Sequence, residues 1–142
     1  KGQTAVAVVA EVKIDHAAEE VCINRIWCAQ DCGLVINPSQ VENQIMGNIV
    51  WGCSVALKER ITITAGEVEE SNFDTDEILR HDETPEMTVA LIDAPEQPPV
   101  AVGESAFGPV APAIANAVFA ATGRRIRNLP ISYDSLFSNG DA

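Results

Sequence analysis

The stretch "TAVAVVAEVKI", residues 4–14, decides the fold class, because apolar side chains recur at every second position as in a half-buried strand. The polar Glu11 and Lys13 fall on the opposite face. The segment "VCINRIWCA", 21–29, is also typical of a strand, and the short polar link between the two favours an antiparallel hairpin with His16 in its turn. The inward face of the first strand would carry Val6, Val8, Ala10, Val12 and Ile14.

A long helix is predicted from about Pro38 to Arg60, because apolar residues recur there every three to four positions. Asn37 or Ser39 would be its N-cap, with proline tolerated in the first turn. Gly47 and Gly52 inside the helix each cost about 1 kcal/mol relative to alanine, so a close approach is expected at both. Tight packing against the sheet is the favoured explanation, and a ligand approaching the helix is the alternative.

The second half of the chain contains another helix and further strands. The helix is predicted from about Pro109 to Thr122, with Gly123 at the position of a C-terminal capping glycine. Residues 60–68 are interpreted as a strand and a glycine turn, 86–94 have a strand pattern, and 124–132 is interpreted as a basic edge-like strand. Together these elements predict one α+β domain over residues 1–142, with two main helices packed on a mixed, largely antiparallel sheet.

Composition limits the possible functions. The chain has 142 residues, 46% hydrophobic and 21% charged, with a net charge of −12, which argues against a nucleic-acid or anionic-membrane partner. The sequence contains no run of about 18 apolar residues, so no segment is expected to span a bilayer. The opening Lys-Gly-Gln-Thr leads directly into a strand pattern and not into a signal peptide, so we expect a piece of something longer.

The four cysteines and two histidines suggest no metal site. Cys22, Cys28, Cys32 and Cys53 lack the paired spacing of zinc sites, so we interpret them as small buried hydrophobes. A metal site is the less favoured alternative, since Cys22 and Cys28 would point to the same face of a strand. The histidines, the one in the hairpin turn and His81, are interpreted as solvated.

Glu104 ends a loop that three prolines stiffen, directly before the second predicted helix. Such a loop holds its last side chains more firmly than a glycine-serine loop would, as the positioning of a catalytic group requires. A glutamate before a helix is also commonly a solvated partner of the helix macrodipole. The pattern by itself leaves both interpretations open.

Five motifs follow one another along the chain: "VAEVKID", "RIWCAQDCGLVINPSQVENQIMG", "ALKERIT", "SNF" and "VGESAFGPVAPAIANAVFAATGRRIRNLPI". In this order they resemble the molybdenum hydroxylase family, which includes xanthine dehydrogenases and aldehyde oxidases. The resemblance is greatest to the molybdopterin-binding large (beta) subunit of isoquinoline 1-oxidoreductase-like enzymes, and it implies that the chain is the C-terminal part of a cofactor-binding subunit several times longer.

The resemblance also implies roles for four residues. Glu104 matches the glutamate of the family's G-V-G-E motif and would be the active-site base beside molybdenum, a task that suits a carboxylate. Val102 and Gly103 match the backbone that lies against the cofactor. Gln44 matches a glutamine that binds the pterin part of the molybdenum cofactor.

Three positions depart from the family pattern. Ala101 replaces the first glycine of G-V-G-E, a mild change if its φ stays below zero. Asn48 replaces a glycine of the helix and belongs to the few residue types that tolerate φ above zero. Thr75-Asp76 stands where an aspartate-tyrosine pair is frequent, which removes aromatic packing area.

By this resemblance the chain is part of a molybdenum-dependent hydroxylase or oxidoreductase. It would hydroxylate an N-heteroaromatic compound or oxidise an aldehyde with oxygen from water, and pass electrons to an iron–sulfur subunit. The implied partners are the rest of the molybdenum-binding subunit, that iron–sulfur subunit and a small-molecule substrate, and the isolated chain would self-associate through its uncovered surface. The alternative is a folded, catalytically inactive truncated module with a structural or interaction role. Localisation stays unassigned, since bacterial cytoplasm and periplasm both fit a soluble chain.

Overall fold

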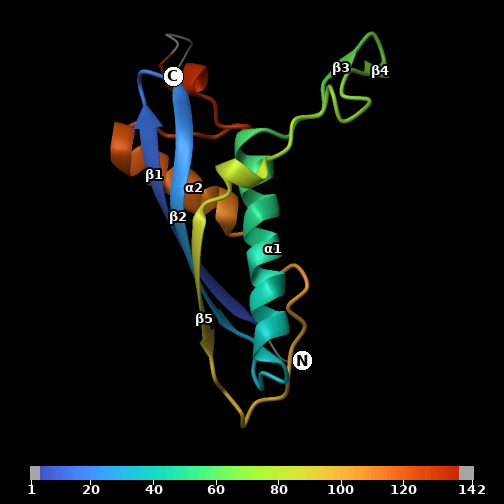
Figure 1. Ribbon diagram of the computed structural model, residues 1–142, viewed down its shortest axis with the longest axis vertical. Coiled ribbons are helices and arrows are strands. Elements are labelled where there is room, and N and C mark those ends of the chain that lie inside the picture. The colour runs from blue at the N-terminus through green and yellow to red at the C-terminus, as the bar shows by residue number, and fades with distance from the viewer. Residues whose placement is uncertain (1–3, 138–142) are drawn as a thin grey trace.

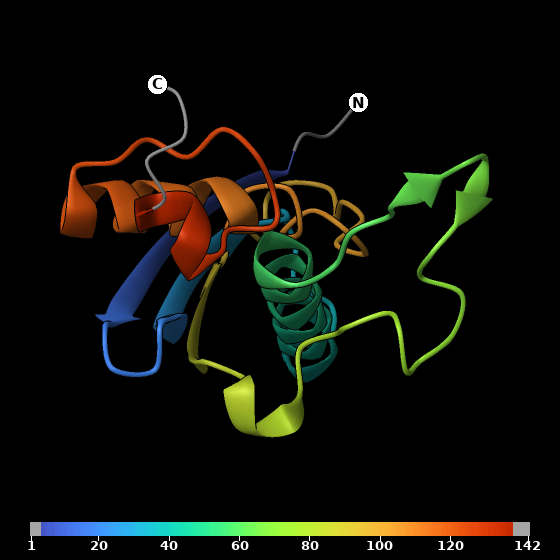
Figure 2. The ribbon, with the colours of Figure 1, turned by 90° about the horizontal axis from the view of Figure 1, so that it is seen from above.

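The computed structural model describes residues 4–137 (Figure 1). A three-stranded sheet of order β1-β2-β5 carries two long helices, and a two-stranded hairpin projects away from them (Figures 1 and 2). In chain order the elements are β1 (Ala5–Asp15), β2 (Glu20–Asp31), α1 (Pro38–Leu57), β3 (Ile63–Thr64), β4 (Glu67–Val68), the 3-10 turn η1 (His81–Glu83), β5 (Glu86–Ile92), α2 (Val110–Thr122) and α3 (Tyr133–Phe137).

The sheet is mixed, as the sequence predicts. β1 and β2 form a long antiparallel hairpin, and β5 adds to the other edge of β2 in parallel. A parallel neighbour needs a crossover connection, and the chain between β2 and β5 supplies it through α1. The predicted α+β class, with two main helices on a largely antiparallel sheet, is confirmed.

Both long helices cover one face of the sheet. The alternation of β1 places its even-numbered residues on this face, in register with the buried side of β2. α2 lies over β1, and α1 lies over β2 and β5. The core between them consists of fully buried aliphatic side chains, among them Ile26, Ile45, Ile49, Ile114 and Val118.

A β-bulge in β2 corrects one sequence-based expectation. The register shifts between Glu11 and Val12, which leaves Asn24 as the extra residue of β2. Cys22 and Cys28 therefore lie on opposite faces of the sheet and not on the same one, because the extra residue inverts the alternation between them. Cys28, Cys32 and Cys53 are buried, as predicted, whereas Cys22 is half-buried.

The helix ends follow the predicted caps closely. Asn37 is the N-cap of α1, and its Oδ1 accepts a hydrogen bond from the backbone N–H of Gln40 at 3.3 Å. The helix ends at Leu57, three residues before the predicted Arg60. At the end of α2, Gly123 has a φ of 71° and donates its N–H to the carbonyl of Phe119 at 2.8 Å, so the predicted glycine cap is confirmed.

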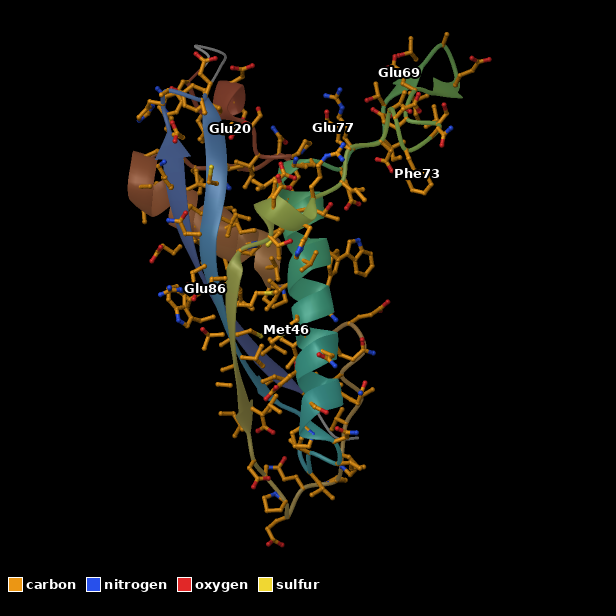
Figure 3. All side chains as sticks on the ribbon, in the orientation of Figure 1. Glu20, Met46, Glu69, Phe73, Glu77 and Glu86 are labelled. Carbon is orange, nitrogen blue, oxygen red and sulfur yellow. The ribbon has the colours of Figure 1, made fainter. Side chains whose placement is uncertain are left out.

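One predicted strand is absent from the structure, and another leads into its predicted glycine turn. Residues 124–132 form no strand, because Pro130 has no N–H to donate and the N–H of Ile131 donates instead to the carbonyl of Ala56 at 2.7 Å. Residues 60–68 contain the predicted glycine turn, which has positive φ at Ala65 and Gly66, and the chain on its two sides pairs as the short β3–β4 hairpin. Figure 3 shows this hairpin and Phe73 standing away from the helices and the sheet.

The two histidines differ in their contacts. His16 is exposed, but its Nδ1 lies 2.9 Å from the hydroxyl of Tyr133, and its ring meets the edge of Phe137. It therefore joins the β1–β2 turn to α3, and the prediction that it is only solvated is wrong. His81 is exposed at the start of η1.

Candidate functional site

The structure brings Gln44 and Gly103 together through the side chain of Asn48. Asn48 Nδ2 donates to the carbonyl of Gln44 at 2.6 Å, one helical turn earlier, and to the carbonyl of Gly103 at 2.8 Å. α1 and the loop before α2 therefore lie side by side, as Figure 1 also shows. Residues 55 positions apart form one surface because of this contact.

The two helix glycines face different surroundings. A Cβ at Gly52 would lie 2.6 Å from the Cβ of Val110, so this glycine allows α1 and α2 to pack closely. A Cβ at Gly47 would meet nothing within 4 Å, and Gln44 one turn earlier is exposed. Close packing is confirmed for Gly52, but the partner is Val110 of α2 and not the sheet. The close approach expected at Gly47 is not found among the described residues, and this glycine borders an open surface beside Gln44.

The loop that carries Glu104 is fixed on both sides of this residue. Before it, the carbonyl of Gly103 accepts from Asn48; after it, Ser105 Oγ accepts a hydrogen bond from Gln30 Nε2 at 2.6 Å. The N–H of Phe107 donates to the carbonyl of Glu104 at 3.2 Å, which closes a turn. The side chain of Glu104 itself is exposed. Its backbone is therefore held while its carboxylate faces outward.

An aromatic pair lies next to this turn. Trp51 of α1 stacks on Phe107, with ring centroids 4.1 Å apart and an angle of 28° between the planes. Trp51 is 46% exposed, so one side of the pair remains available to solvent. The stack is a second link between α1 and the Glu104 loop. It is an apolar contact, whereas the first link, from Asn48 to Gly103, is a hydrogen bond.

The proline-rich segment before Glu104 is tied to the connection between β2 and α1. The N–H of Leu34 donates to the carbonyl of Gln97 at 3.1 Å. Gly33 has a φ of 72°, and a Cβ there would lie 2.3 Å from the carbonyl oxygen of Pro98. Only glycine fits this close approach, which supports the prediction of a stiff loop.

Sequence reasoning missed one buried amide of the site, Gln30, and the side-chain role of a second, Asn48. Gln30 is fully buried and Asn48 is 5% exposed. The sequence signal for such a residue is an amide side chain at a position where the apolar periodicity expects a buried hydrophobic residue. Gln30 occupies such a position on the inward side of β2, and Asn48 occupies one between Ile45 and Ile49 of α1. Asn48 was expected for its tolerance of positive φ, but it has ordinary helical geometry, and its side chain makes the contacts.

Buried cysteine thiols and a cavity at the end of α1 are further features of the domain. Burial raises the pKa of the Cys53 thiol to about 12 and also raises that of Cys28. Within residues 4–137, no group of three or more His, Cys, Asp or Glu side chains could hold a metal ion.

A cavity of about 620 Å³ lies at the C-terminal end of α1, and neither Gln44 nor Glu104 lines it. Of the helices in the described part of the chain, none has the length and apolarity to cross a membrane.

Fold and site together define an α+β domain with an exposed carboxylate, an exposed amide and an open glycine surface where a helix meets a stiff loop. Such a surface suits a domain that contributes one side of a ligand site. The family model for the molybdopterin cofactor-binding domain matches residues 2–85, and the chain belongs to this family. The family predicted from the ordered motifs is therefore confirmed.

Known relatives match most of the chain. It is 39% identical over 124 residues to one of the subunits of nicotinate dehydrogenase from Pseudomonas putida, and the match covers 87% of this chain and 10% of that protein. It is 36% identical over 126 residues to the beta subunit of isoquinoline 1-oxidoreductase from Brevundimonas diminuta, and this match covers 89% of the chain and 16% of that protein. The chain thus spans about a tenth to a sixth of the length of these relatives.

A solved structure confirms the fold. Quinoline 2-oxidoreductase from Pseudomonas putida superposes with a TM-score of 0.80 at 25% identity, over 89% of this chain and 17% of that one. The region of likeness includes most of the helix and sheet elements described above, since nine-tenths of the chain takes part. The domain architecture is therefore the one found within a larger oxidoreductase chain.

Proposed function

We propose that this chain forms one side of the cofactor site in a molybdenum-dependent hydroxylase, with Glu104 as the general base. The observation that carries the proposal is the contact of Asn48 with both Gln44 and Gly103. It places the glutamine expected to bind the pterin beside the loop expected to carry the base. These two elements come from separate motifs of the sequence, so their meeting in space is independent support.

The residues present fit the edge of such a cofactor. Gln44 is exposed and offers an amide donor and acceptor, and the surface at Gly47 and Gly103 is free of neighbouring atoms within 4 Å of a Cβ. A bulky cofactor could approach the backbone there without meeting a side chain. No lysine or arginine occurs between Arg25 and Lys58, so α1 offers no basic side chain to the phosphate of the cofactor.

The cofactor, when bound, supplies a two-electron oxidant and activates water for attack on an electron-poor carbon. In the overall reaction a C–H bond is replaced by a C–OH bond with oxygen from water, and two protons and two electrons leave. Glu104 accepts one of these protons on a carboxylate oxygen, because its side chain is exposed and its backbone is held. Val102 and Gly103 present backbone to the cofactor.

The substrate class is an N-heteroaromatic compound, with aldehydes as the second candidate. Nicotinate, isoquinoline and quinoline in the names of the matched proteins are all N-heteroaromatic. An aldehyde oxidoreductase molybdenum-binding subunit of Escherichia coli, 32% identical over 133 residues, supports the second candidate. The electrons would pass to an iron–sulfur subunit, and the rest of the molybdenum-binding subunit would complete the site around this chain.

Glu104→Gln in the complete enzyme tests this proposal. The amide keeps the size of the side chain but cannot accept a proton at neutral pH, so kcat on the N-heteroaromatic substrate should fall at least about 10²-fold. Glu96→Gln, an exposed glutamate in the same loop, is the matched control and should leave turnover unchanged. Molybdenum content, measured by mass spectrometry, should match wild type in both variants. Turnover of the fully loaded Glu104→Gln enzyme within threefold of wild type would contradict the role of Glu104.

A further inference from the structure

Two buried amides hold the two chain neighbours of Glu104, Gly103 by its backbone carbonyl and Ser105 by its side-chain hydroxyl. Asn48 reaches from α1 to the carbonyl of Gly103, and Gln30 reaches from the end of β2 to the hydroxyl of Ser105. The two held residues are the immediate neighbours of Glu104 in the chain. The anchors come from different elements, a helix and a strand, so the loop cannot shift along either one without losing a hydrogen bond.

In both amides the NH₂ group makes hydrogen bonds, whereas the oxygen makes none among the described residues. Gln30 Oε1 and Asn48 Oδ1 are buried without a hydrogen-bond partner among the described residues. A buried amide oxygen left unpaired is costly, and an apolar side chain of similar size would avoid that cost. In both side chains it is the NH₂ group that makes contacts, and in both cases one contact is with a neighbour of Glu104.

We propose that Gln30 and Asn48 are positioning residues for Glu104, which set the direction of its carboxylate through the backbone. This inference rests on the proposed function of Glu104. Neither amide hydrogen-bonds to the carboxylate, so the two amides affect the position of the Glu104 carboxylate and not its proton affinity. A loosened loop would spread the carboxylate over several positions and reduce the fraction of enzyme in the productive geometry.

Hydrogen exchange of the 142-residue chain tests the holding of the loop without any cofactor. The reporter is the amide of Phe107, which donates to the carbonyl of Glu104, and α1 core amides such as that of Ile49 report global stability. Asn48→Ala and Ser105→Ala should each speed exchange at Phe107 about fivefold relative to Ile49. Asn43→Ala, on the exposed side of α1, and Ser105→Thr, which keeps the hydroxyl, should leave the ratio unchanged.

The same variants in the complete enzyme test the consequence for catalysis. Asn48→Ala and Ser105→Ala should lower kcat about tenfold while KM changes less than twofold and molybdenum content stays at the wild-type level. Ser105→Thr, which keeps the hydroxyl, should have the kcat of wild type. This difference from Ser105→Ala would assign the loss of kcat to the missing hydrogen bond and not to a general loss of stability.

Two results would overturn the inference. One is a Phe107 to Ile49 exchange ratio that stays at the wild-type value in both alanine variants. The other is a wild-type kcat in Asn48→Ala and Ser105→Ala when Glu104→Gln is inactive. If Glu104→Gln retains turnover but the exchange ratio changes as expected, the proposed function fails while the holding of the loop is upheld. The two failures are therefore distinguishable.

Discussion

Asn48 of α1 donates a hydrogen bond to the backbone carbonyl of Gly103 at 2.8 Å, and this contact joins the helix to the loop of the candidate base. The same Nδ2 also donates to the carbonyl of Gln44. One nitrogen thus uses both of its protons on two carbonyl oxygens from separate parts of the chain. Replacing the donor by an acceptor is the most direct perturbation of this arrangement.

Asn48→Asp should lower the free energy of unfolding by about 1–3 kcal/mol at pH 7, because the introduced carboxylate would face two carbonyl oxygens in a buried position. Burial raises the pKa of such a carboxyl above its unfolded value, so the deficit should shrink as the pH falls and the protonated form regains a donor. Urea denaturation at pH 4.5 and pH 7.5 measures it. Asn43→Asp is the exposed control, and an equal deficit in both variants would contradict the prediction.

Gly52→Ala and Gly47→Ala should change stability in opposite directions. At Gly52 the new Cβ would lie 2.6 Å from the Cβ of Val110, and overpacking of this kind costs about 1–3 kcal/mol. At Gly47 the Cβ has free space, so the gain in helix propensity should stabilise the chain by about 0.5–1 kcal/mol. Urea denaturation of both variants gives the comparison. Equal stabilisation by the two substitutions would show that α1 and α2 are not packed this closely.

The thiol of Cys53 should resist alkylation in the folded chain. Its pKa of about 12 follows from burial, so at pH 8 only about one thiol in 10⁴ is ionised. Iodoacetamide labelling followed by peptide mass spectrometry should find Cys22, which is half-buried, modified well before Cys53. In 8 M urea the difference should disappear. Equal labelling rates under native conditions would contradict the burial of Cys53.

The isolated chain should carry less than about a tenth of an equivalent of molybdenum, because a few contacts around Gln44 and Gly103 rarely offset the cost of association. Metal analysis of the purified chain measures this, and stoichiometric molybdenum would contradict it.

The isolated chain should self-associate, because apolar side chains on the outer face of the sheet are uncovered, such as Val9 at 60% and Ile92 at 49% exposure. Light scattering over a concentration series would detect it, and a constant monomer mass would be the opposing result.

The sequence predicted the elements that depend on local patterns. β1, α1 and α2 each have a continuous period of two or about 3.6, and β2 has a period of two on either side of Asn24. The caps at Asn37 and Gly123 use chemistry within one turn of the chain. Where the local pattern was interrupted, prediction failed. The extra residue Asn24 inverted the faces of β2, and Pro130 turned a predicted strand into a segment held by one hydrogen bond from Ile131.

The candidate site divides in the same way. Glu104, Val102, Gly103 and Gln44 could be named from motifs, because each motif is a short run of residues. The contacts that join them could not, since Asn48 and Gly103 are 55 positions apart and Gln30 and Ser105 are 75 apart. Such pairs are set by how α1 and β2 pack around the loop, and packing depends on the whole core. The sequence determined which groups are present and on which elements, and only the tertiary structure decided which of them hydrogen-bond across the molecule.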